Sequence, residues 1–371
     1  MSKQPPGKRR VLVTEGPQRE AVPDTMQALR KTAPAPGAEL VEVSVPSPGP
    51  GEVLLKVDVA SICGSDLHIY GWDAWAPERV HVPMTFGHEI AGHVVALGPE
   101  THDLSLGTFV SVETHLFCGR CTMCRTGRAH ICENLRIVGV DTEGGFAEYV
   151  SIPAPNAWEV GQGIAPDVAS IQEPFGNAVH AAFPQGEESD LTAASVAVLG
   201  CGPIGLFAVG IARASGARLV MAADLNDYRL GLAKQMGADL LIDPSREDPV
   251  DAVMEATGGH GAEVVLEMSG AAAAIEQGTR MLAPGGRMSL LGLPTSPVTL
   301  DLLEPVIFKE ARLYGVTGRE LFRTWQQTTT LLGSGMVDVS PVITHRFQLD
   351  QFEEAFEAAA SGRSGKVILV P

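Results

Sequence analysis

The chain has 371 residues, a length that suggests two domains rather than one. Its formal net charge of -17 argues against nucleic-acid binding, which depends on Lys and Arg neutralising phosphates. No apolar run reaches the ~18 residues that a membrane span needs, so we expect neither a nucleic-acid nor a membrane partner.

The first 25 residues lack the apolar stretch and cleavage site of a secretory signal. We expect residues 1–25 to be a disordered N-terminal extension and the protein to be cytoplasmic. Six cysteines are present without a secretion signal, so clustered thiols indicate metal ligands rather than disulfides.

The next part of the sequence predicts a β-rich, irregular domain that continues to about Pro155. Strand-like segments fall at Met26–Leu29, Leu40–Val45 and Val53–Val59, with Gly and Pro turns between them. The last expected strand, Lys366–Val370, is predicted to return to this domain.

After residue 171 the pattern changes to regular alternation of strand and helix. The predicted strands are Ser195–Leu199, Leu219–Ala223, Leu240–Ile242, Ala262–Glu267 and Arg287–Leu291. The predicted helices run from Gly205 to about Ser215, and then over Asp227–Met236, Pro249–Thr257 and Ala271–Leu282. Such alternation predicts an α/β domain with a parallel, doubly wound sheet.

A G-x-G-x-x-G sequence, Gly200, Gly202 and Gly205, follows the first of these strands and opens a helix. In that context the glycines permit a tight turn, close approach to a pyrophosphate and close packing of helix on strand. Asp224 ends the next strand, where a carboxylate accepts hydrogen bonds from ribose hydroxyls and repels a 2′-phosphate. We therefore expect NAD rather than NADP, although Arg229 is a residue type that can accept a phosphate.

Four cysteines lie in the pattern C-x2-C-x2-C-x7-C, at Cys118, Cys121, Cys124 and Cys132. Zinc favours four thiolates in a tetrahedron, and such a closed set leaves no open coordination position. We predict a structural zinc, with an iron–sulfur cluster or a metal-free loop as the alternatives.

A second set of metal-binding residue types is spread along the chain as Cys63, His88, Glu89 and Glu173. Catalytic zinc sites use three protein ligands and leave a fourth position for water or substrate. Four candidates exceed that number, so one carboxylate must leave or the ion must become five-coordinate. The sequence does not decide which carboxylate leaves.

The C-G-S-D-x-H segment from Cys63, the G-H-E segment around His88 and the four-cysteine loop resemble the zinc-containing medium-chain dehydrogenases. The resemblance implies a β-rich GroES-like catalytic domain and a Rossmann nucleotide-binding domain. Its expected bounds are 26–173 and 315–371 for the catalytic domain, with a structural zinc lobe at 115–135, and 174–314 for the Rossmann domain.

Finer features are similar to the L-threonine 3-dehydrogenase branch of that family, namely Tyr70–Ala76, Glu173–His180, Asn226–Leu230 and Gly318–Trp325. This likeness implies a homotetramer with two zinc ions per subunit. The implied reaction is oxidation of L-threonine to 2-amino-3-oxobutanoate with NAD. It also implies that His115 lies near the substrate.

Further residues are predicted to bind the cofactor. The cofactor site is expected to include Pro203, Ile204, Leu291, Leu293, Val316 and Thr317. Thr317 stands where the family often has an aromatic residue, and Ser65 where threonine is common.

In the expected mechanism zinc lowers the pKa of a substrate hydroxyl, and the proton leaves through Ser65, the nicotinamide ribose and His68. Two alternatives stay open. One is a polyol or other secondary-alcohol dehydrogenase, which needs the same zinc and NAD residues. The other is a non-enzymatic nucleotide-binding scaffold, in which the metal ligands would be lost.

Overall fold

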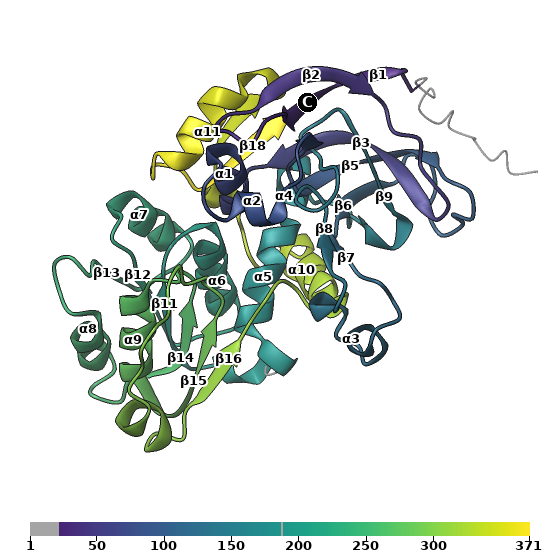
Figure 1. The fold of residues 1–371 in the computed structure, drawn as a ribbon. Coiled ribbons are helices and arrows are strands. Elements are labelled where there is room, and N and C mark those ends of the chain that lie inside the picture. Colours follow the sequence, from purple (N-terminus) through teal and green to yellow (C-terminus); the bar gives the residue numbers. More distant parts are fainter. Residues whose placement is uncertain (1–21, 187) are drawn as a thin grey trace, which may run out of the picture.

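A computed structural model describes residues 22–186 and 188–371 of the chain. The expected extension, residues 1–25, falls almost entirely outside the described residues. Figure 1 shows two halves, a β-rich half and a parallel-sheet half, with the helices α5 (Gln172–Ala182) and α10 (Arg323–Gly333) between them.

The β-rich half is built from three sheets. A three-stranded sheet has the order β2 (Glu39–Ser44), β1 (Thr25–Lys31), β4 (Met84–Thr85). A seven-stranded sheet has the order β10 (Ala157–Glu159), β6 (Phe109–Val112), β5 (Glu89–Leu97), β3 (Glu52–Ser61), β18 (Lys366–Val370), β17 (Ile343–Gln348), and β9 (Tyr149–Pro153) also pairs with β3. The third sheet has two antiparallel strands, β7 (His115–Leu116) and β8 (Arg136–Ile137).

The β-rich half also contains short helices. They are α1 (Gly64–Gly71), α2 (Ala76–Arg79), α3 (Thr122–Arg125), α4 (Pro166–Ser170) and α11 (Phe352–Ala360), with 3-10 turns at Ala129–Ile131, Ala154–Asn156, Ser340–Val342 and Leu349–Gln351. The predicted return of the last strand is confirmed, because β18 pairs antiparallel with β3 through Ile368–Ser61 and Leu369–Ala60. The chain end therefore lies beside the strand that leads into Cys63.

The other half contains one six-stranded sheet. Its strands are β11 (Ser195–Leu199), β12 (Leu219–Ala223), β13 (Leu240–Ile242), β14 (Ala262–Glu267), β15 (Leu282–Leu290) and β16 (Arg312–Gly315). Its helices are α6 (Pro203–Ala214), α7 (Asp227–Gln235), α8 (Pro249–Ala256) and α9 (Ala272–Arg280), with a π-helical turn at Leu303–Ile307 and 3-10 turns at Pro184–Gly186 and Glu188–Leu191.

The sheet order β13-β12-β11-β14-β15-β16 is parallel throughout, as the alternation of strand and helix predicts. Ligands bind such sheets at the carboxyl ends of the strands where the strand order reverses, here next to β11. One prediction is wrong in detail: α9 ends at Arg280 rather than Leu282, because Leu282 already pairs with Ala262 in the sheet.

A single hydrophobic cluster joins the two halves. It contains Val59 and Ala91 from the β-rich sheet, Phe175 from α5, and Val196 and Leu206 from the nucleotide half. Helix α5 runs across the expected boundary at residue 173, so the domain bounds stay a prediction. Within the part of the chain that the structure describes, no helix is long and apolar enough to cross a membrane.

Candidate active site

Three of the four predicted catalytic-metal residues come together where β3 ends and β5 begins. Cys63 follows β3, and Glu89 opens β5 opposite Ser61. One ligand atom from each of Cys63, His88 and Glu89 lies within 4.8 Å of the others. A thiolate, an imidazole and a carboxylate at this separation are a donor set suited to a zinc ion that keeps one position open.

Asp66 contacts two of these three residues, Cys63 and His88, although it was not among the predicted site residues. The Asp66 side chain is fully buried, and its Oδ2 accepts a hydrogen bond of 2.8 Å from the backbone N–H of Cys63. Its Oδ1 lies 3.4 Å from Nδ1 of His88. A carboxylate behind a ligating histidine fixes the ring orientation, which is the usual arrangement around protein-bound zinc.

Glu89 is engaged from behind by a buried ammonium group. Nζ of Lys366 donates to Oε1 of Glu89, and the hydroxyl of Ser61 donates to its Oε2. Burial alone would lower the pKa of Lys366, but the negative charges of Glu89 and Cys63 outweigh burial and raise it. Lys366 therefore stays charged beside the metal-binding group.

Glu173, the fourth predicted ligand, is not part of the three-residue group and has other partners. Its Oε1 accepts a hydrogen bond from Thr114 at 3.1 Å and forms an ion pair with Nη1 of Arg319. Arg319 also donates from Nε to Glu113 at 2.9 Å and from Nη1 to Asn177 at 3.0 Å. Because all three guanidinium nitrogens have partners inside the protein, Arg319 is not available to bind a substrate carboxylate.

His115 lies against the segment that precedes α10. A Cβ atom on Gly318, whose φ is +57°, would come within 2.1 Å of Cε1 of His115. Burial and then the charge of Arg319 lower the pKa of His115 to about 4, so the ring is neutral at physiological pH. A neutral imidazole can donate one hydrogen bond and accept another, which suits a polar substrate group.

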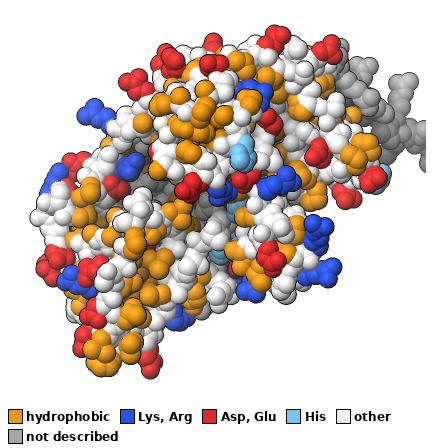
Figure 2. Space-filling model, in the orientation of Figure 1, with side chains coloured by type: hydrophobic (Ala, Val, Ile, Leu, Met, Phe, Trp, Pro, Cys, Tyr) orange, Lys and Arg blue, Asp and Glu red, His pale blue; other side chains and the backbone are white. Residues whose placement is uncertain are grey.

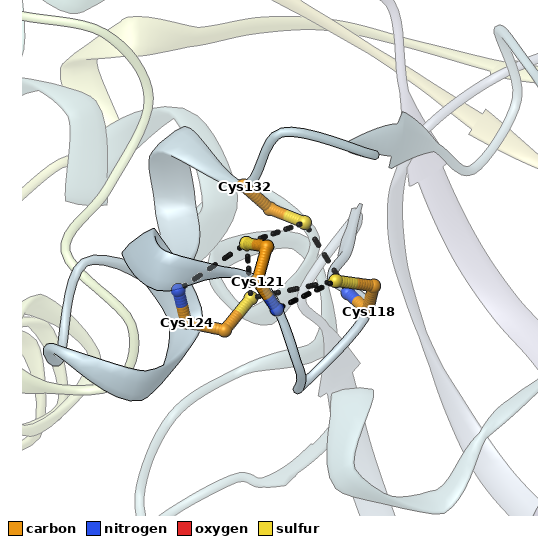
Figure 3. Close-up of side chains that lie close together, drawn as sticks. All are labelled: Cys118, Cys121, Cys124 and Cys132. Carbon is orange, nitrogen blue, oxygen red and sulfur yellow. Dashed lines mark hydrogen bonds between the residues drawn. The ribbon is translucent and has the colours of Figure 1, made fainter.

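The cysteine loop has the geometry of a closed tetrahedral site (Figure 3), with the four sulfur atoms facing one another. The Sγ atoms are separated by 3.4 Å for Cys121–Cys124, 3.8 Å for Cys121–Cys132 and 4.0 Å for Cys118–Cys124. Four sulfurs at ~2.3 Å from one zinc ion lie ~3.8 Å apart, so these separations fit the ion.

The nucleotide turn has the close contacts that its glycines predict. A Cβ on Gly205 would lie 1.9 Å from the carbonyl oxygen of Gly200, so only glycine fits there. Helix α6 then begins with Pro203 and Ile204, and its N-terminus faces the turn. Asp224 accepts hydrogen bonds from the backbone N–H of Cys201 at 2.7 Å and of Asn226 at 2.9 Å, which fixes the carboxylate at this edge.

The other predicted cofactor-binding residues follow strands of the same sheet. Leu291 and Leu293 follow β15, and Val316 and Thr317 follow β16. The backbone N–H of Val316 donates to the carbonyl of Leu290 at 2.9 Å, which keeps the two segments adjacent. Leu293 is 83% exposed. Arg229 is half-buried at the start of α7.

The two predicted proton-path residues both lie on α1. The hydroxyl of Ser65 is 3.4 Å from Nε2 of His88, next to the metal-binding group. His68 is one turn further on, with 55% of its side chain exposed. Figure 2 shows that the molecular surface is indented between the two halves and that histidine side chains lie at this indentation.

Sequence reasoning missed four charged residues around the metal-binding group: Asp66, Glu113, Arg319 and Lys366. Asp66 and Arg319 stood inside segments that the resemblance used, the C-G-S-D-x-H segment and Gly318–Trp325. Lys366 and Glu113 carry no local signal, because what places them is the pairing of strands far apart in the sequence.

Comparison with known proteins agrees with this geometry. Residues 49–162 match the model for an alcohol dehydrogenase GroES-like domain, and residues 203–334 match that for a zinc-binding dehydrogenase. A zinc-binding dehydrogenase from Sinorhizobium meliloti 1021, solved with NADP, is 30% identical with a TM-score of 0.84 over 94% of this chain and 99% of that one. The chain belongs to the zinc-binding alcohol dehydrogenase family and is an oxidoreductase that uses zinc and a nicotinamide cofactor.

Within that family, similar curated relatives include several L-threonine 3-dehydrogenases. L-threonine 3-dehydrogenase from Symbiobacterium thermophilum is 51% identical over 94% of this chain and 98% of its own. L-threonine 3-dehydrogenase from Bacillus subtilis is 51% identical over 93% of this chain and 99% of its own.

Proposed function

We propose that this protein oxidises L-threonine to 2-amino-3-oxobutanoate and passes the hydride to NAD. The observation that carries the proposal is the group of Cys63, His88 and Glu89, in a chain about half identical to L-threonine 3-dehydrogenases. The reaction balances as one alcohol and NAD⁺ giving one ketone, NADH and a proton.

We further propose two zinc ions per subunit, one held by the four cysteines of the loop and one by Cys63, His88 and Glu89. Zinc at the second site supplies a Lewis acid that makes a substrate hydroxyl easier to deprotonate. Ser65 lies beside His88 and is placed to take that proton, and His68 is placed to release it to water. We propose that His115, neutral and buried beside Glu113, binds the polar part of the substrate.

Asp224 supports NAD as the preferred cofactor. Its carboxylate is fixed at the end of β12 by two backbone donors, at the position where a 2′-phosphate would be repelled. Asp224→Gly should weaken NAD binding and relax discrimination against NADP. An unchanged ratio of kcat/KM for the two cofactors would remove Asp224 from this role.

The decisive test of the activity is Cys63→Ser. The variant should lose turnover of L-threonine while it keeps its circular dichroism spectrum, its melting temperature and one zinc ion per subunit by elemental analysis. The reciprocal variant, Cys118→Ser, should lose the other ion and melt at a lower temperature. Full turnover by the Cys63→Ser enzyme would refute the catalytic metal.

The second candidate substrate is a polyol or another secondary alcohol. It needs the same zinc and nicotinamide residues, so only rates distinguish it from L-threonine. Steady-state kcat/KM should be highest for L-threonine in a panel with sorbitol, butanediol and simple alcohols. A preference for sorbitol or butanediol would replace the proposed substrate and leave the metal chemistry intact.

We also propose a homotetramer in the cytoplasm. Four apolar side chains around the π-helical turn, Leu302, Leu303, Ile307 and Phe308, are 50%, 51%, 60% and 67% exposed, and strand β16 forms the edge of its sheet. Exposed apolar patches and unpaired sheet edges both favour self-association. Light scattering should give four subunits. None of the six cysteines forms a disulfide in the described residues, which fits a reducing compartment.

A further inference from the structure

The loop after α1 holds Asp73 against His68, the residue placed at the outer end of the proposed proton path. Nδ1 of His68 and Oδ2 of Asp73 form a hydrogen-bonded pair. The side chains are 55% and 46% exposed, so the pair lies at the surface and hydrophobic burial does not hold it together. Surface pairs of this kind contribute little to stability, so a functional role explains the His68–Asp73 pair better than a structural one.

The backbone adopts an uncommon conformation to bring Asp73 to this position. Trp72 ends α1 in the left-handed region, at φ 52° and ψ 49°, which costs a bulky residue about 1–2 kcal/mol. The turn folds the chain back, so that the backbone N–H of Asp73 donates to the carbonyl of His68 at 3.4 Å. The carboxylate is thereby returned to the face of the helix that carries the imidazole.

The turn is fixed by a buried lysine of strand β1. Lys31 is fully buried, and its Nζ donates to the carbonyl oxygens of Gly37 at 2.7 Å and Tyr70 at 3.0 Å. The same Nζ lies 5.2 Å from the ring centroid of Trp72, within range of a cation–π interaction. The position of Asp73 is therefore set by the core of the β-rich half.

Both oxygens of Asp73 have defined partners. Oδ1 accepts a hydrogen bond of 3.0 Å from the backbone N–H of Trp75, while Oδ2 faces His68. The hydrogen bond from His68 lowers the pKa of Asp73, so the carboxylate is ionised and can only accept. Nδ1 of His68 must then carry a proton. Among the described residues, Nε2 of His68 has no hydrogen-bond partner, which leaves it as the acceptor nitrogen.

We propose that Asp73 is a positioning residue that acts through His68. It keeps the proton on Nδ1, leaves Nε2 to accept the proton that the substrate hydroxyl loses, and offsets the positive charge of the ring until the proton passes to water. The hydride goes to NAD, as in the proposed function on which this inference rests. A histidine oriented by a carboxylate is a more effective proton acceptor than one that rotates freely.

Asp73→Asn is the informative variant, because asparagine keeps the size and can still accept from Trp75 but cannot carry the negative charge. The rate of NADH formation in the first turnover should fall about tenfold, with KM for L-threonine nearly unchanged. His68→Gln should slow the same step at least as much. The double variant should be no slower than His68→Gln alone, because Asp73 acts only through the histidine.

A matched pair elsewhere supplies the control. Nδ1 of His93 on β5 lies 2.5 Å from Oδ2 of Asp58 on β3, which is the same chemistry away from the metal-binding group. Asp58→Asn should leave the first turnover unchanged. Nitrogen-15 NMR of the His68 side chain should show Nδ1 protonated in the wild type and a mixture of tautomers in Asp73→Asn.

The outcomes separate the two proposals. If His68→Gln turns over normally, the proton path through His68 fails, and the inference about Asp73 fails with it. If His68→Gln is slow but Asp73→Asn matches the wild type, or if the two effects multiply in the double variant, the path stands and the role of Asp73 is overturned.

Discussion

Arg319→Met tests how far the buried charge network stabilises the fold. The guanidinium is 1% exposed and pairs with Glu113, whose side chain is 0% exposed, and with Glu173, at 7%. Removing one partner of a buried ion pair costs about 3–5 kcal/mol, and here two carboxylates lose the same cation. For a chain of 371 residues, a loss of this size should lower Tm by roughly 4–6 °C.

The stability lost in Arg319→Met should also depend on pH. Burial alone would raise the pKa of Glu113, but the charge and hydrogen bonds of Arg319 outweigh it and hold that pKa below its usual range. In the wild type this stability is present above the unfolded pKa and is lost as pH falls through the folded one. Without Arg319 the folded pKa rises, so the penalty grows as pH rises above the unfolded value of about 4.3.

Urea denaturation of both proteins between pH 5 and pH 8 measures this difference. The gap between wild type and Arg319→Met should be widest at the alkaline end, and adding Glu113→Gln should recover part of it. Arg346→Met removes a half-exposed partner of Asp167 and should cost less than about 1 kcal/mol. If the difference in unfolding free energy between the two proteins widens as pH falls, the electrostatic reasoning is refuted. If Arg319→Met is as stable as the wild type, the network is not stabilising.

Three further results are expected. Gly205→Ala places a Cβ 1.9 Å from the oxygen of Gly200, so NADH affinity by fluorescence titration should fall more than tenfold, and wild-type affinity would contradict the close turn. His115 has a folded pKa of about 4, so the wild type loses stability as pH falls from the unfolded pKa of about 6.5. In metal-free His115→Gln that slope should flatten by up to about 1.4 kcal/mol per pH unit, and an unchanged slope would clear His115. Lys366→Met removes a positive charge beside Glu89 and should tighten zinc binding in chelator competition, whereas Lys366→Arg should not; weaker binding in the Met variant would refute this electrostatic reasoning.

The elements that the sequence predicted well are those whose pattern is local. The strand Leu219–Ala223 is apolar, short and bounded by polar residues, and its observed bounds are the predicted ones. The end of α9 was missed because the pairing of Leu282 with Ala262 decides it, a contact between segments that helical periodicity does not see. The contact that requires Gly205 was predictable because it is made with Gly200 in the same short segment, whereas Gly200 itself packs against the distant Ser269.

The candidate site divides in the same way. Ligand types and spacing identified the cysteine loop, since all four sulfurs come from one loop. The cations behind the carboxylates could not be found, because Lys366 reaches Glu89 only through the pairing of β18 with β3. Arg319 likewise reaches Glu113 from a position 206 residues further along the chain. Buried charges are uncommon, so composition gives no reason to expect them at a particular lysine or arginine.

The positions of the two buried cations, Lys366 and Arg319, bear on the question of which carboxylate leaves the metal ion. Glu89 is paired with Lys366 and Glu173 with Arg319, so each carboxylate is already held by a buried cation. The ring of His88, by contrast, has the carboxylate of Asp66 behind it, 3.4 Å from Nδ1. Glu89 already lies within 4.8 Å of the other ligand atoms, whereas Glu173 is held by Arg319 and Thr114 outside that group. Of the two carboxylates, Glu89 is consequently the one already in position to bind the same ion as Cys63 and His88.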